Sequence, residues 1–289
     1  MNIEHFCVPE GKRLNLADHP TDFTADYIIK EEAIKDLKRN IKRLRELQSV
    51  LYADDKYALL IIFQAMDAAG KDGAIKHVMS GLNPQGTQVF SFKAPSAEER
   101  DHDYLWRAAK SLPERGRIGI FNRSYYEEVL VVRVHPEILQ DRNLPDHIKQ
   151  DPSIWQQRFD QIRKFEKHLT ENGTQVLKFF LNVSKDEQKR RFLSRIYTPE
   201  KNWKFSAADV RERGFWDDYQ RVYSEAIEAT STNDSPWYIL PADHKWFTRL
   251  AVSEVIAQKL ASLDLSYPEV TEEHRKRLLE AKEMLESES

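Results

Sequence analysis

One stretch of the sequence, from Tyr57 to Gly73, constrains the fold more than any other. It opens with the apolar run YALLIIF, passes through the small-residue turn AMDAAGK and enters a helical pattern near Ala74. A strand, a tight turn with a lysine and a helix form the layout of a phosphate-binding loop. Backbone N–H groups and the positive end of the helix dipole attract an anion there, and the lysine adds a charge. The stretch therefore predicts a phosphate site at the carboxyl end of a buried strand.

The turn departs from the usual phosphate-loop pattern at two positions. The pattern G-x-x-x-x-G-K-[ST] has a glycine where this chain has Ala65, and a hydroxyl side chain where it has Asp72. The alternative interpretation is an ordinary buried strand that ends in a helix cap, with Lys71 exposed to solvent. On this stretch alone, both interpretations stay open.

Composition limits the class of protein that can contain such a site. With 289 residues, of which 31% are charged and 40% hydrophobic, the chain can bury a core as a soluble globular protein. No apolar run approaches the roughly 20 residues of a membrane span, and the N-terminus lacks the apolar segment of a signal peptide. Cys7 is the only cysteine, so we expect a cytoplasmic protein without disulfides. The net charge of −3 at pH 7 gives no indication of nucleic acid or a membrane as a partner.

Apolar segments of strand length alternate with helical patterns along the chain. Strands are expected at residues 57–63, 87–92, 117–121, 174–183 and 237–240. This alternation predicts an α/β protein with a parallel sheet, helices on both faces and a site at the carboxyl ends of the strands. Single helices are expected over residues 96–112 and 153–171, and Ser184 and Glu187 match a capping box.

The expected domain organisation has three parts. Residues 1–56 form an N-terminal arm and a helix that packs on the body, residues 57–265 form the main domain, and residues 266–289 form a helical tail. In the helix expected over residues 31–51, apolar residues recur every three or four positions, and Lys and Arg fill many of the others. These basic residues form either the solvated face of a packed helix or a surface that leads a polyanion toward the site.

Phosphoryl transfer requires positioned phosphates and neutralised charge, and three residues can supply both. Asp67 lies inside the loop, where a carboxylate would repel phosphate unless Mg²⁺ lay between them. We therefore expect Asp67 to bind the metal, with a turn-stabilising role as the alternative. Directly after the third strand, Asn122 can hold a metal-bound water, and Arg123 has the forked donors that suit a phosphate. The other interpretation of Arg123 is a pairing with Glu127 or Glu128.

A group of cations suggests a mobile cover over the site. Arg190, Arg191, Arg195, Lys201 and Lys204 lie close together in the chain, beside Trp203 and Phe205. Cations bind phosphates, an aromatic ring can stack on a base, and a lid excludes water when it closes. A solvated helix with a packed tryptophan is the alternative for any single residue. The co-occurrence predicts a lid over about residues 185–215.

Together these segments resemble the polyphosphate kinase 2 family. The matching stretches, over about residues 65–250, are AMDAAGKDGAIKHVMSGLNPQG, SFKAPS, FNRSYYEEVLVVRVHPE, FLNVSKDEQKRRFLSRI, KNWKFSAADVRERGFWDDY and STNDSPWYILPADHKWFTRL. The resemblance implies a thymidylate-kinase-like P-loop kinase fold, with three layers, a five-stranded parallel sheet and a helical lid. It also implies reversible transfer of a terminal phosphoryl group between inorganic polyphosphate and a nucleotide, with Mg²⁺ or, as an alternative, Mn²⁺.

By position, the resemblance assigns roles to individual residues. Asp67 would hold Mg²⁺, Lys71 would contact the phosphates, and Arg123 would follow Asn122 at the Walker B position. The residues that would bind the nucleotide and its phosphates are Ala68, Ala69, Gly70, Lys71, Asp72, Glu127 and, in the lid, Arg191 and Arg195. The residues that would line the polyphosphate path are Lys76, Asn83, Gln85 and Lys93.

The loop variant QAMDAAGKDG, together with FNRSYYEEV, is similar to the class III subgroup, which accepts nucleoside mono- and diphosphates. Many family members carry an aspartate in place of Asn122 and a glycine in place of Ala65, and Glu127 and Glu128 are candidates for subgroup-specific residues. The resemblance implies AMP and ADP as acceptors, guanine nucleotides as further candidates, and a homo-oligomer, either a dimer or a tetramer.

Two other functions remain as alternatives. An ATP-dependent nucleoside monophosphate kinase is disfavoured because the loop has Asp67 and no Ser or Thr after Lys71. A non-catalytic binding module with a decayed loop is disfavoured because Lys71, Arg123 and the complete lid are all present.

Overall fold

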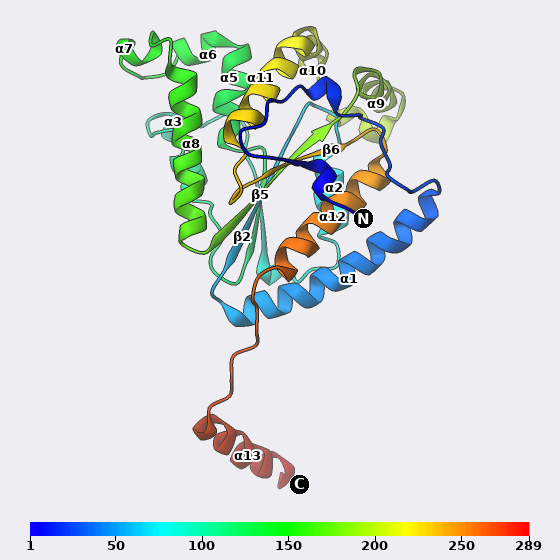
Figure 1. Cartoon of the computed structure of the whole chain (residues 1–289), viewed down its shortest axis with the longest axis vertical. Coiled ribbons are helices and arrows are strands. Elements are labelled where there is room, and N and C mark those ends of the chain that lie inside the picture. Colours follow the sequence, from blue (N-terminus) through cyan, green and yellow to red (C-terminus); the bar gives the residue numbers. More distant parts are fainter. Residues whose placement is uncertain (289) are drawn as a thin grey trace.

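The protein folds around one sheet whose strands are mostly parallel (Figure 1). A computed structural model describes residues 1–288, and the side chain of Lys204 lies outside the described part. The strand order is β1-β6-β5-β2-β4-β3. The strands are β1 (Cys7–Val8), β2 (Ala58–Ala65), β3 (Thr87–Ser91), β4 (Ile118–Asn122), β5 (Thr174–Asn182) and β6 (Trp237–Pro241). The five strands from β2 to β6 are parallel to one another, as the alternation of elements predicted.

The prediction of five strands was wrong by one, because β1 adds a sixth at the edge of the sheet. β1 pairs antiparallel with β6, with Cys7 opposite Tyr238 and Val8 opposite Trp237. The hydroxyl of Ser231 also donates to the Val8 carbonyl oxygen at 2.7 Å. Two residues cannot display the alternation that identifies a strand in sequence, so β1 exists only through its neighbour. It attaches the N-terminal arm to the body.

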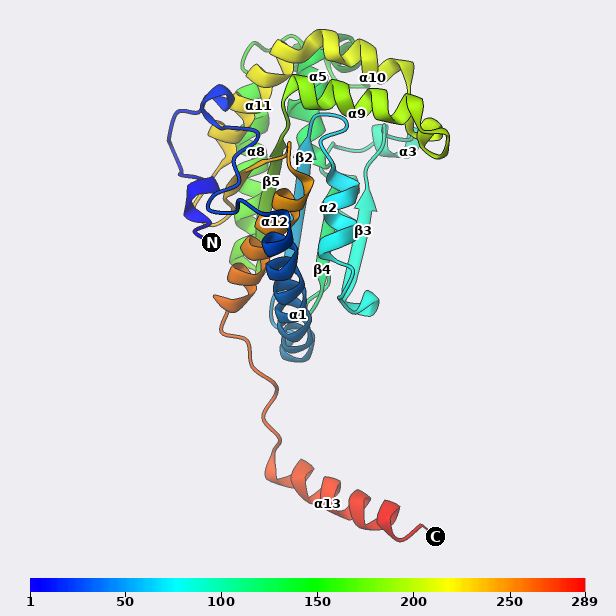
Figure 2. The same ribbon diagram turned by 90° about the vertical axis from the view of Figure 1, so that its right-hand side faces the viewer.

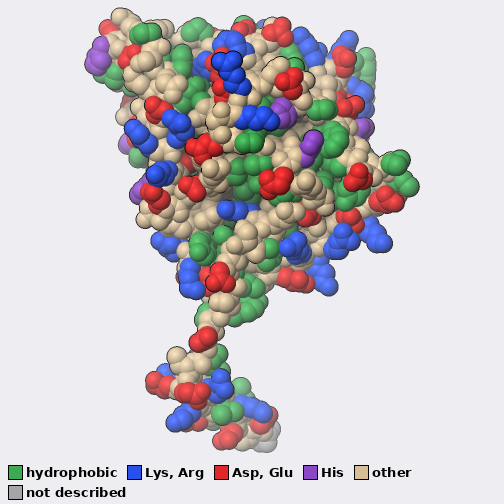
Figure 3. Space-filling view, viewed as in Figure 1, with side chains coloured by type: hydrophobic (Ala, Val, Ile, Leu, Met, Phe, Trp, Pro, Cys, Tyr) green, Lys and Arg blue, Asp and Glu red, His purple; other side chains and the backbone are tan. Residues whose placement is uncertain are grey.

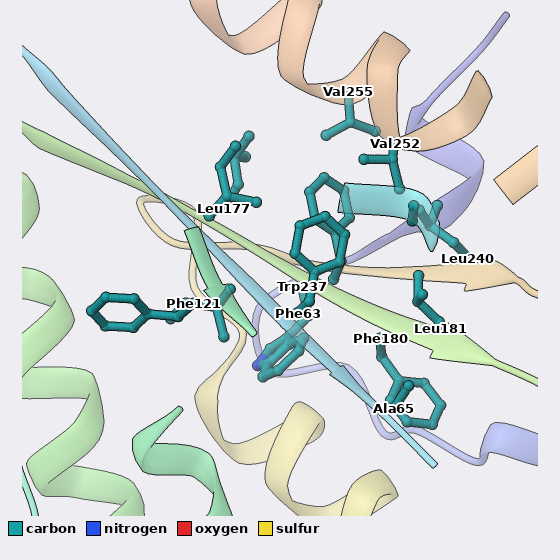
Figure 4. Close-up of a cluster of buried hydrophobic side chains, with 14 of the residues drawn as sticks. Phe63, Ala65, Phe121, Leu177, Phe180, Leu181, Trp237, Leu240, Val252 and Val255 are labelled. Atoms are coloured by element: carbon teal, nitrogen blue, oxygen red, sulfur yellow. The ribbon is translucent and has the colours of Figure 1, made fainter. Parts of the chain in front are cut away.

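β2 lies in the interior of the sheet, between β4 and β5, and all eight of its residues are buried. Figure 4 shows Phe63 and Trp237 within the core, with Val252 and Val255 of α12 nearby. A strand that is covered on both faces has a continuous apolar run rather than an alternating one. This is why the run before the loop was visible in the sequence, and its burial fixes the position of Ala65, where the site begins.

Helices cover both faces of the sheet and complete three layers (Figures 1 and 2). On one face, α12 packs against both α1 and α2, and on the other face α11 packs against both α8 and α5. These helices are α1 (Lys30–Asp54), α2 (Lys71–Val78), α5 (Val131–Val134), α8 (Ile154–Glu171), α11 (Trp216–Thr230) and α12 (Lys245–Ala261). Figure 3 shows Lys and Arg side chains gathered where α1 meets solvent, which agrees with a solvated face on a packed helix.

The single helix predicted over residues 96–112 is instead two short helices, α3 (Ala97–Arg100) and α4 (Trp106–Ala109). Between them, the carboxylate of Asp103 accepts a hydrogen bond from the Leu105 N–H at 2.9 Å. An aspartate that bonds to the backbone two residues later favours a turn over a continuing helix. The other short elements are α6 (Pro136–Gln140), α7 (Asp146–Lys149), η1 (Glu4–Phe6), η2 (Leu16–Asp18), η3 (Pro84–Gly86) and η4 (Tyr125–Val129).

The segment predicted as a lid begins directly after β5 and lies across the loop end of the sheet (Figure 2). Its elements are α9 (Lys185–Tyr197), η5 (Pro199–Lys204), α10 (Ala207–Glu212) and η6 (Arg213–Phe215). Ser184 caps α9 by accepting from the Glu187 N–H, as predicted, but the Glu187 carboxylate binds Arg190 and Arg191 and does not close a capping box.

The C-terminal helix α13 (Glu272–Glu286) stands apart from the body at the end of an extended linker (Figure 1). Large apolar side chains on it, including Leu278, Leu279 and Leu285, are exposed. Among residues 1–288, no helix is both long and apolar enough to cross a membrane.

Candidate functional site

The loop after β2 adopts a conformation that few residues other than glycine favour. Ala68 has φ +59° and Gly70 has φ +113°, both in the left-handed region. Gly70 is the N-cap of α2, which begins at Lys71. The Lys71 ammonium folds back and donates to the Ala65 carbonyl oxygen at 2.9 Å. The lysine therefore lies over the loop, as in a phosphate cradle at a helix N-terminus.

Arg191 holds this loop from the lid side. A guanidinium has five N–H donors, and all five of Arg191 are used. Nη1 donates to the carbonyl oxygens of Ala68 and Ala69, Nη2 donates to those of Ala242 and Asp243, and Nε donates to Glu187. The resemblance implied that Arg191 binds phosphate directly, but in this arrangement Arg191 braces the loop and has no donor left for a ligand.

The carboxyl end of β4 lies beside the phosphate loop. β4 runs parallel to β2 with Asn122 opposite Phe63. The Asn122 amide donates to the Asp72 carboxylate at 2.8 Å, so the two residues that depart from the common patterns contact each other. Arg123 also has a left-handed backbone, with φ +64°, and its N–H donates to the Phe63 carbonyl oxygen. A non-glycine residue held in this region is often found at a functional site.

Arg123 lies between two carboxylates. Its Nη2 donates to Asp67 at 2.9 Å, and its Nη1 lies 3.9 Å from Glu127. Burial lowers the pKa of Arg123, but the carboxylates of Glu127 and Asp67 outweigh this effect and raise the pKa above its ordinary value. Glu128 points away and pairs with Arg142 and Arg158. Of the two alternative pairings for Arg123, the structure therefore shows only the one with Glu127.

Burial shifts two further groups at this junction. It lowers the pKa of Lys71, and it raises the pKa of the Glu127 carboxyl. In both cases the nearby opposite charges work against the shift: Asp67 for Lys71, and Arg123 and Lys71 for Glu127. The charged forms here are destabilised by lost hydration and stabilised by one another. Such a site favours a ligand that supplies both charge and hydrogen bonds.

A cavity of about 370 Å³ opens beside Asp67 and Arg123. The body contributes Glu127, Val131, Ile138 and the rings of Tyr219 and Tyr223, and the lid contributes Asp209, Glu212 and Arg213. Within the lid, Arg195 of α9 forms an ion pair of 3.5 Å with Asp209 of α10, which lines the cavity. The combination of apolar walls, aromatic rings and polar groups fits a small organic ligand with a phosphate end.

One rim of the cavity joins the lid to the body. Glu212 accepts a hydrogen bond from the Tyr219 hydroxyl at 2.8 Å and contacts His135 Nε2 at 3.0 Å. The ring of His135 packs edge-on against Phe215, and its Nδ1 lies 3.3 Å from Glu137. These contacts connect α10 and η6 with α5 in this conformation.

A buried polar network supports the segment that carries Glu127. The hydroxyls of Tyr125 and Tyr126 both donate to Glu166 at 2.8 Å, and Lys178 of β5 donates to the same carboxylate at 2.5 Å. Both charged side chains are fully buried, and Ser235 donates to Glu166 as well. Removing one member of such a pair leaves an uncompensated charge, which costs roughly 3–5 kcal/mol. The network thus fixes η4, and with it Arg123 and Glu127, to the sheet.

The family of the chain follows from comparison with known proteins. A model of the family Polyphosphate kinase 2 matches residues 27–267, most of the chain. The chain belongs to the polyphosphate kinase 2 family. This confirms the resemblance in the sequence motifs, and it makes the protein a polyphosphate-dependent phosphotransferase.

Relatives in the family match almost the whole chain. The ADP-polyphosphate phosphotransferase of Rhodopseudomonas palustris is 55% identical over 99% of both chains. The AMP/ADP-polyphosphate phosphotransferase of Meiothermus ruber is 42% identical over 90% of this chain and 93% of its own. The crystal structure of Polyphosphate Kinase 2 from Arthrobacter aurescens TC1 matches with a TM-score of 0.87 and 40% identity, over 96% of each chain. The P-loop kinase fold expected for the family therefore holds for this member.

The four residues predicted to line the polyphosphate path lie in different places. Lys76 is exposed on α2, and Lys93 is exposed just after β3, at the loop end of the sheet. Asn83 and Gln85 precede β3, at the opposite edge of the sheet from the loop. The Asn83 side chain caps η3 by accepting from the Gln85 N–H, and its backbone bonds to Gln48. The structure thus gives Asn83 a local role in the turn. The predicted residues that it brings together at the loop are Asp67, Ala68, Ala69, Gly70, Lys71, Asp72, Asn122, Arg123, Glu127 and Arg191.

The site also fits the metal that the family implies. Among the described residues, no group of three or more His, Cys, Asp or Glu side chains could hold a metal by itself. Mg²⁺ seldom needs such a cage, because it keeps several waters and binds one or two carboxylates together with substrate phosphates. Asp67 is partly exposed in the cavity beside Lys71, with one carboxylate oxygen on Arg123. This donor set suits a metal that arrives with its phosphates.

Several cavity residues were not identified from sequence. The Gln188 amide donates to the Asp67 carbonyl oxygen at 2.8 Å and accepts from Arg213, and it thereby links the loop to the lid. Asp209 and Glu212 had no distinguishing pattern beyond their place in the lid. The helix face that carries Tyr219 and Tyr223, four residues apart, was the one available signal, since an aromatic stripe can line a ligand site as well as a core.

Proposed function

We propose that the protein transfers the terminal phosphoryl group of inorganic polyphosphate to AMP and to ADP, giving ADP and ATP. One observation carries the proposal: the phosphate loop with the half-buried Lys71 shares Asp67 with a cavity of nucleoside size, which Arg123 also lines. The names of the Rhodopseudomonas and Meiothermus relatives, which refer to ADP and to AMP/ADP, support both acceptors.

The reaction requires no covalent intermediate. An oxygen of the acceptor phosphate attacks the terminal phosphorus of the chain, and the bond from that phosphorus to the bridging oxygen breaks. The shortened chain leaves with the electron pair. Lys71 stabilises the charge on the transferred group, Arg123 orients the acceptor phosphate, and Asn122 holds Asp72 at the base of the loop. Positioning and charge stabilisation supply most of the catalysis in phosphoryl transfer.

The proposed metal ligand is Asp67. Bound Mg²⁺, or Mn²⁺ in its place, would neutralise charge on the phosphate oxygens. The chain's own contribution is to orient this carboxylate, which Arg123 does from the side chain and Gln188 from the backbone. When phosphates enter, Arg123 can exchange Asp67 for a phosphate, because its forked donors suit both.

Three further properties belong to the proposal. Guanine nucleotides are accepted as well, because the cavity wall near Tyr219 and Tyr223 offers aromatic surface that does not select one purine. The protein is cytoplasmic, where its nucleotide acceptors are found. It forms a homo-oligomer, either a dimer or a tetramer, which the exposed leucines of α13 support and sedimentation equilibrium would test.

A substrate panel tests the proposal. Purified protein is supplied with long-chain polyphosphate and Mg²⁺, and with AMP, ADP, GMP or GDP as the only nucleotide. Chromatography of the products should show ADP from AMP and ATP from ADP, with guanine products at measurable rates. If no acceptor gains a phosphoryl group, the proposed function is refuted. If ADP reacts but AMP does not, the assignment of both acceptors is refuted.

A further inference from the structure

The two sides of the phosphate loop differ in charge. The cavity beside Asp67 is lined by more carboxylates than basic side chains, since Arg123, Arg213 and His135 face five acids. These acids are Asp67, Glu127, Glu137, Asp209 and Glu212. The charged part of a nucleotide in this cavity is only its short phosphate end, which Arg123 can meet. A long chain of phosphates would be repelled along the rest of the wall, so the donor chain must leave the loop on the other side.

On that other side lies the first part of α12. Its residues Lys245 and Arg249 are four positions apart and therefore project from the same face of the helix. A Cβ atom placed on Gly73 would lie 3.6 Å from Arg249 Nη2, which puts this guanidinium beside the first turn of α2. Figure 2 shows α2 and α12 running side by side below α9, and the two helices pack against each other. Arg249 is thus adjacent to the positive end of the phosphate-loop helix.

These cations are not neutralised within the protein. Among the described residues, neither Lys245 nor Arg249 has a hydrogen bond or an ion pair. The nearby acids are already engaged, since Glu187 binds Arg190 and Arg191, and Asp243 accepts from Thr21 and from the Ser184 N–H.

The electrostatic potential around Lys245 is positive, as the effect of its neighbours on its pKa indicates. Burial lowers the pKa of Lys245, and the charges of Arg191, Arg249 and Arg190 lower it further, while Glu187 opposes them. A cation whose neighbours are mostly cations gains when an anion binds between them. Arg190 completes the group from α9, with a side chain that is 75% exposed.

We propose that Lys245 and Arg249, together with Arg190, bind the phosphates of the donor chain that follow the one being transferred. This inference rests on the proposed function and adds to it a subsite and a direction for the chain, from the loop across α12 and away from the acidic cavity. The Lys245 ammonium supplies a compact charge, and the Arg249 guanidinium supplies forked donors that suit phosphate oxygens. Arg190 binds Glu187 through Nε and Nη2, so it adds only its remaining donors.

The test compares two double variants that remove the same charge. K245Q/R249Q removes the α12 pair, and R275Q/K276Q removes an exposed pair on α13, far from the loop. Turnover of ADP is measured with long-chain polyphosphate and with the shortest chain that the wild-type protein uses. In K245Q/R249Q, the KM for long chains should rise about tenfold and its salt dependence should weaken, by roughly 0.7 in the log–log slope for each lost contact. The KM for the shortest chain and kcat should change little, and R275Q/K276Q should match the wild type.

Two results would overturn the inference. One is a KM for long chains that K245Q/R249Q leaves at the wild-type value, and the other is an equal rise for long and short chains, which would indicate damage to the loop itself. Calorimetric titration with long-chain polyphosphate in the absence of nucleotide separates this inference from the proposed function. If the wild type has no turnover, the proposed function fails, and the subsite is still decided by whether K245Q/R249Q binds the chain more weakly than the wild type.

Discussion

Arg191 and Arg190 offer a matched test of how the phosphate loop is held. Both guanidiniums bind Glu187, but the Arg191 side chain is 6% exposed and that of Arg190 is 75% exposed. Arg191→Met removes five hydrogen bonds and leaves the carbonyl oxygens of the loop and of the β6–α12 connection without their donor. Breaking a buried charged pair costs roughly 3–5 kcal/mol. Because Glu187 still pairs with Arg190 in this variant, we expect the free energy of unfolding to fall by an amount near the lower end of that range, about 3 kcal/mol.

The control is Arg190→Met, which breaks an exposed pair with the same carboxylate. Exposed ion pairs contribute up to about 1 kcal/mol, so this variant should stay within that range. Urea-induced unfolding, followed by tryptophan fluorescence, gives both free energies of unfolding. Arg191→Met should also lower kcat, because the loop carbonyls lose the group that fixes them.

The reasoning would be refuted if Arg191→Met cost no more than Arg190→Met. It would also be refuted if Arg191→Met were as unstable as expected but kept the wild-type kcat, since the loop would then hold its shape without the brace. An unchanged stability with a raised KM for polyphosphate would instead identify Arg191 as a direct phosphate ligand, as the sequence alone suggested.

Three substitutions around the loop test the remaining assignments. Lys71→Ala should abolish turnover in a coupled ATP assay without unfolding the protein, whereas a wild-type rate would show that the loop is not catalytic. Asp67→Asn should lose activity that excess Mg²⁺ restores only in part, and an unchanged Mg²⁺ dependence would contradict the metal role. Glu127→Gln should stabilise the protein more at about pH 8 than at about pH 5, as thermal unfolding would measure. Burial raises the pKa of Glu127, with Arg123 opposing, and a carboxyl with a raised pKa contributes stability that is lost as pH rises through the folded-state value. The neutral amide has no such loss, so a stability difference that does not change with pH would contradict the assignment.

The elements that position the site could be predicted because they carry strong local signals. A fully buried central strand appears as an apolar run, and a parallel sheet appears as alternating strands and helices. The carboxyl ends of β2 and β4 were therefore expected to meet, and Asn122 and Arg123 do lie beside the loop. The short edge strand β1 had no such signal, because its two residues depend on β6 for their conformation.

The detailed geometry of the site depends on contacts between distant parts of the chain. Nothing local to Ala68 or Arg123 shows that their backbones are left-handed, because neighbouring strands and the lid impose that conformation. The hydrogen bond from the Gln188 amide to the Asp67 carbonyl oxygen joins residues that are 121 positions apart in the chain. Asn83 and Gln85 lie between α2 and β3, and in a parallel sheet the connection from a helix into the next strand lies at the amino ends of the strands. The motif grouped these two residues with the loop, but their place in the chain puts them at the opposite end of the sheet.

The central claim is that the loop takes its phosphoryl group from polyphosphate and not from ATP. The most direct measurement supplies AMP with long-chain polyphosphate and Mg²⁺ in the absence of ATP, beside a parallel reaction of AMP with ATP alone, and follows ADP in both. The account predicts rapid formation of ADP and then ATP from polyphosphate. Formation of ADP only in the reaction with ATP would contradict it and would identify the protein as an ATP-dependent nucleoside monophosphate kinase.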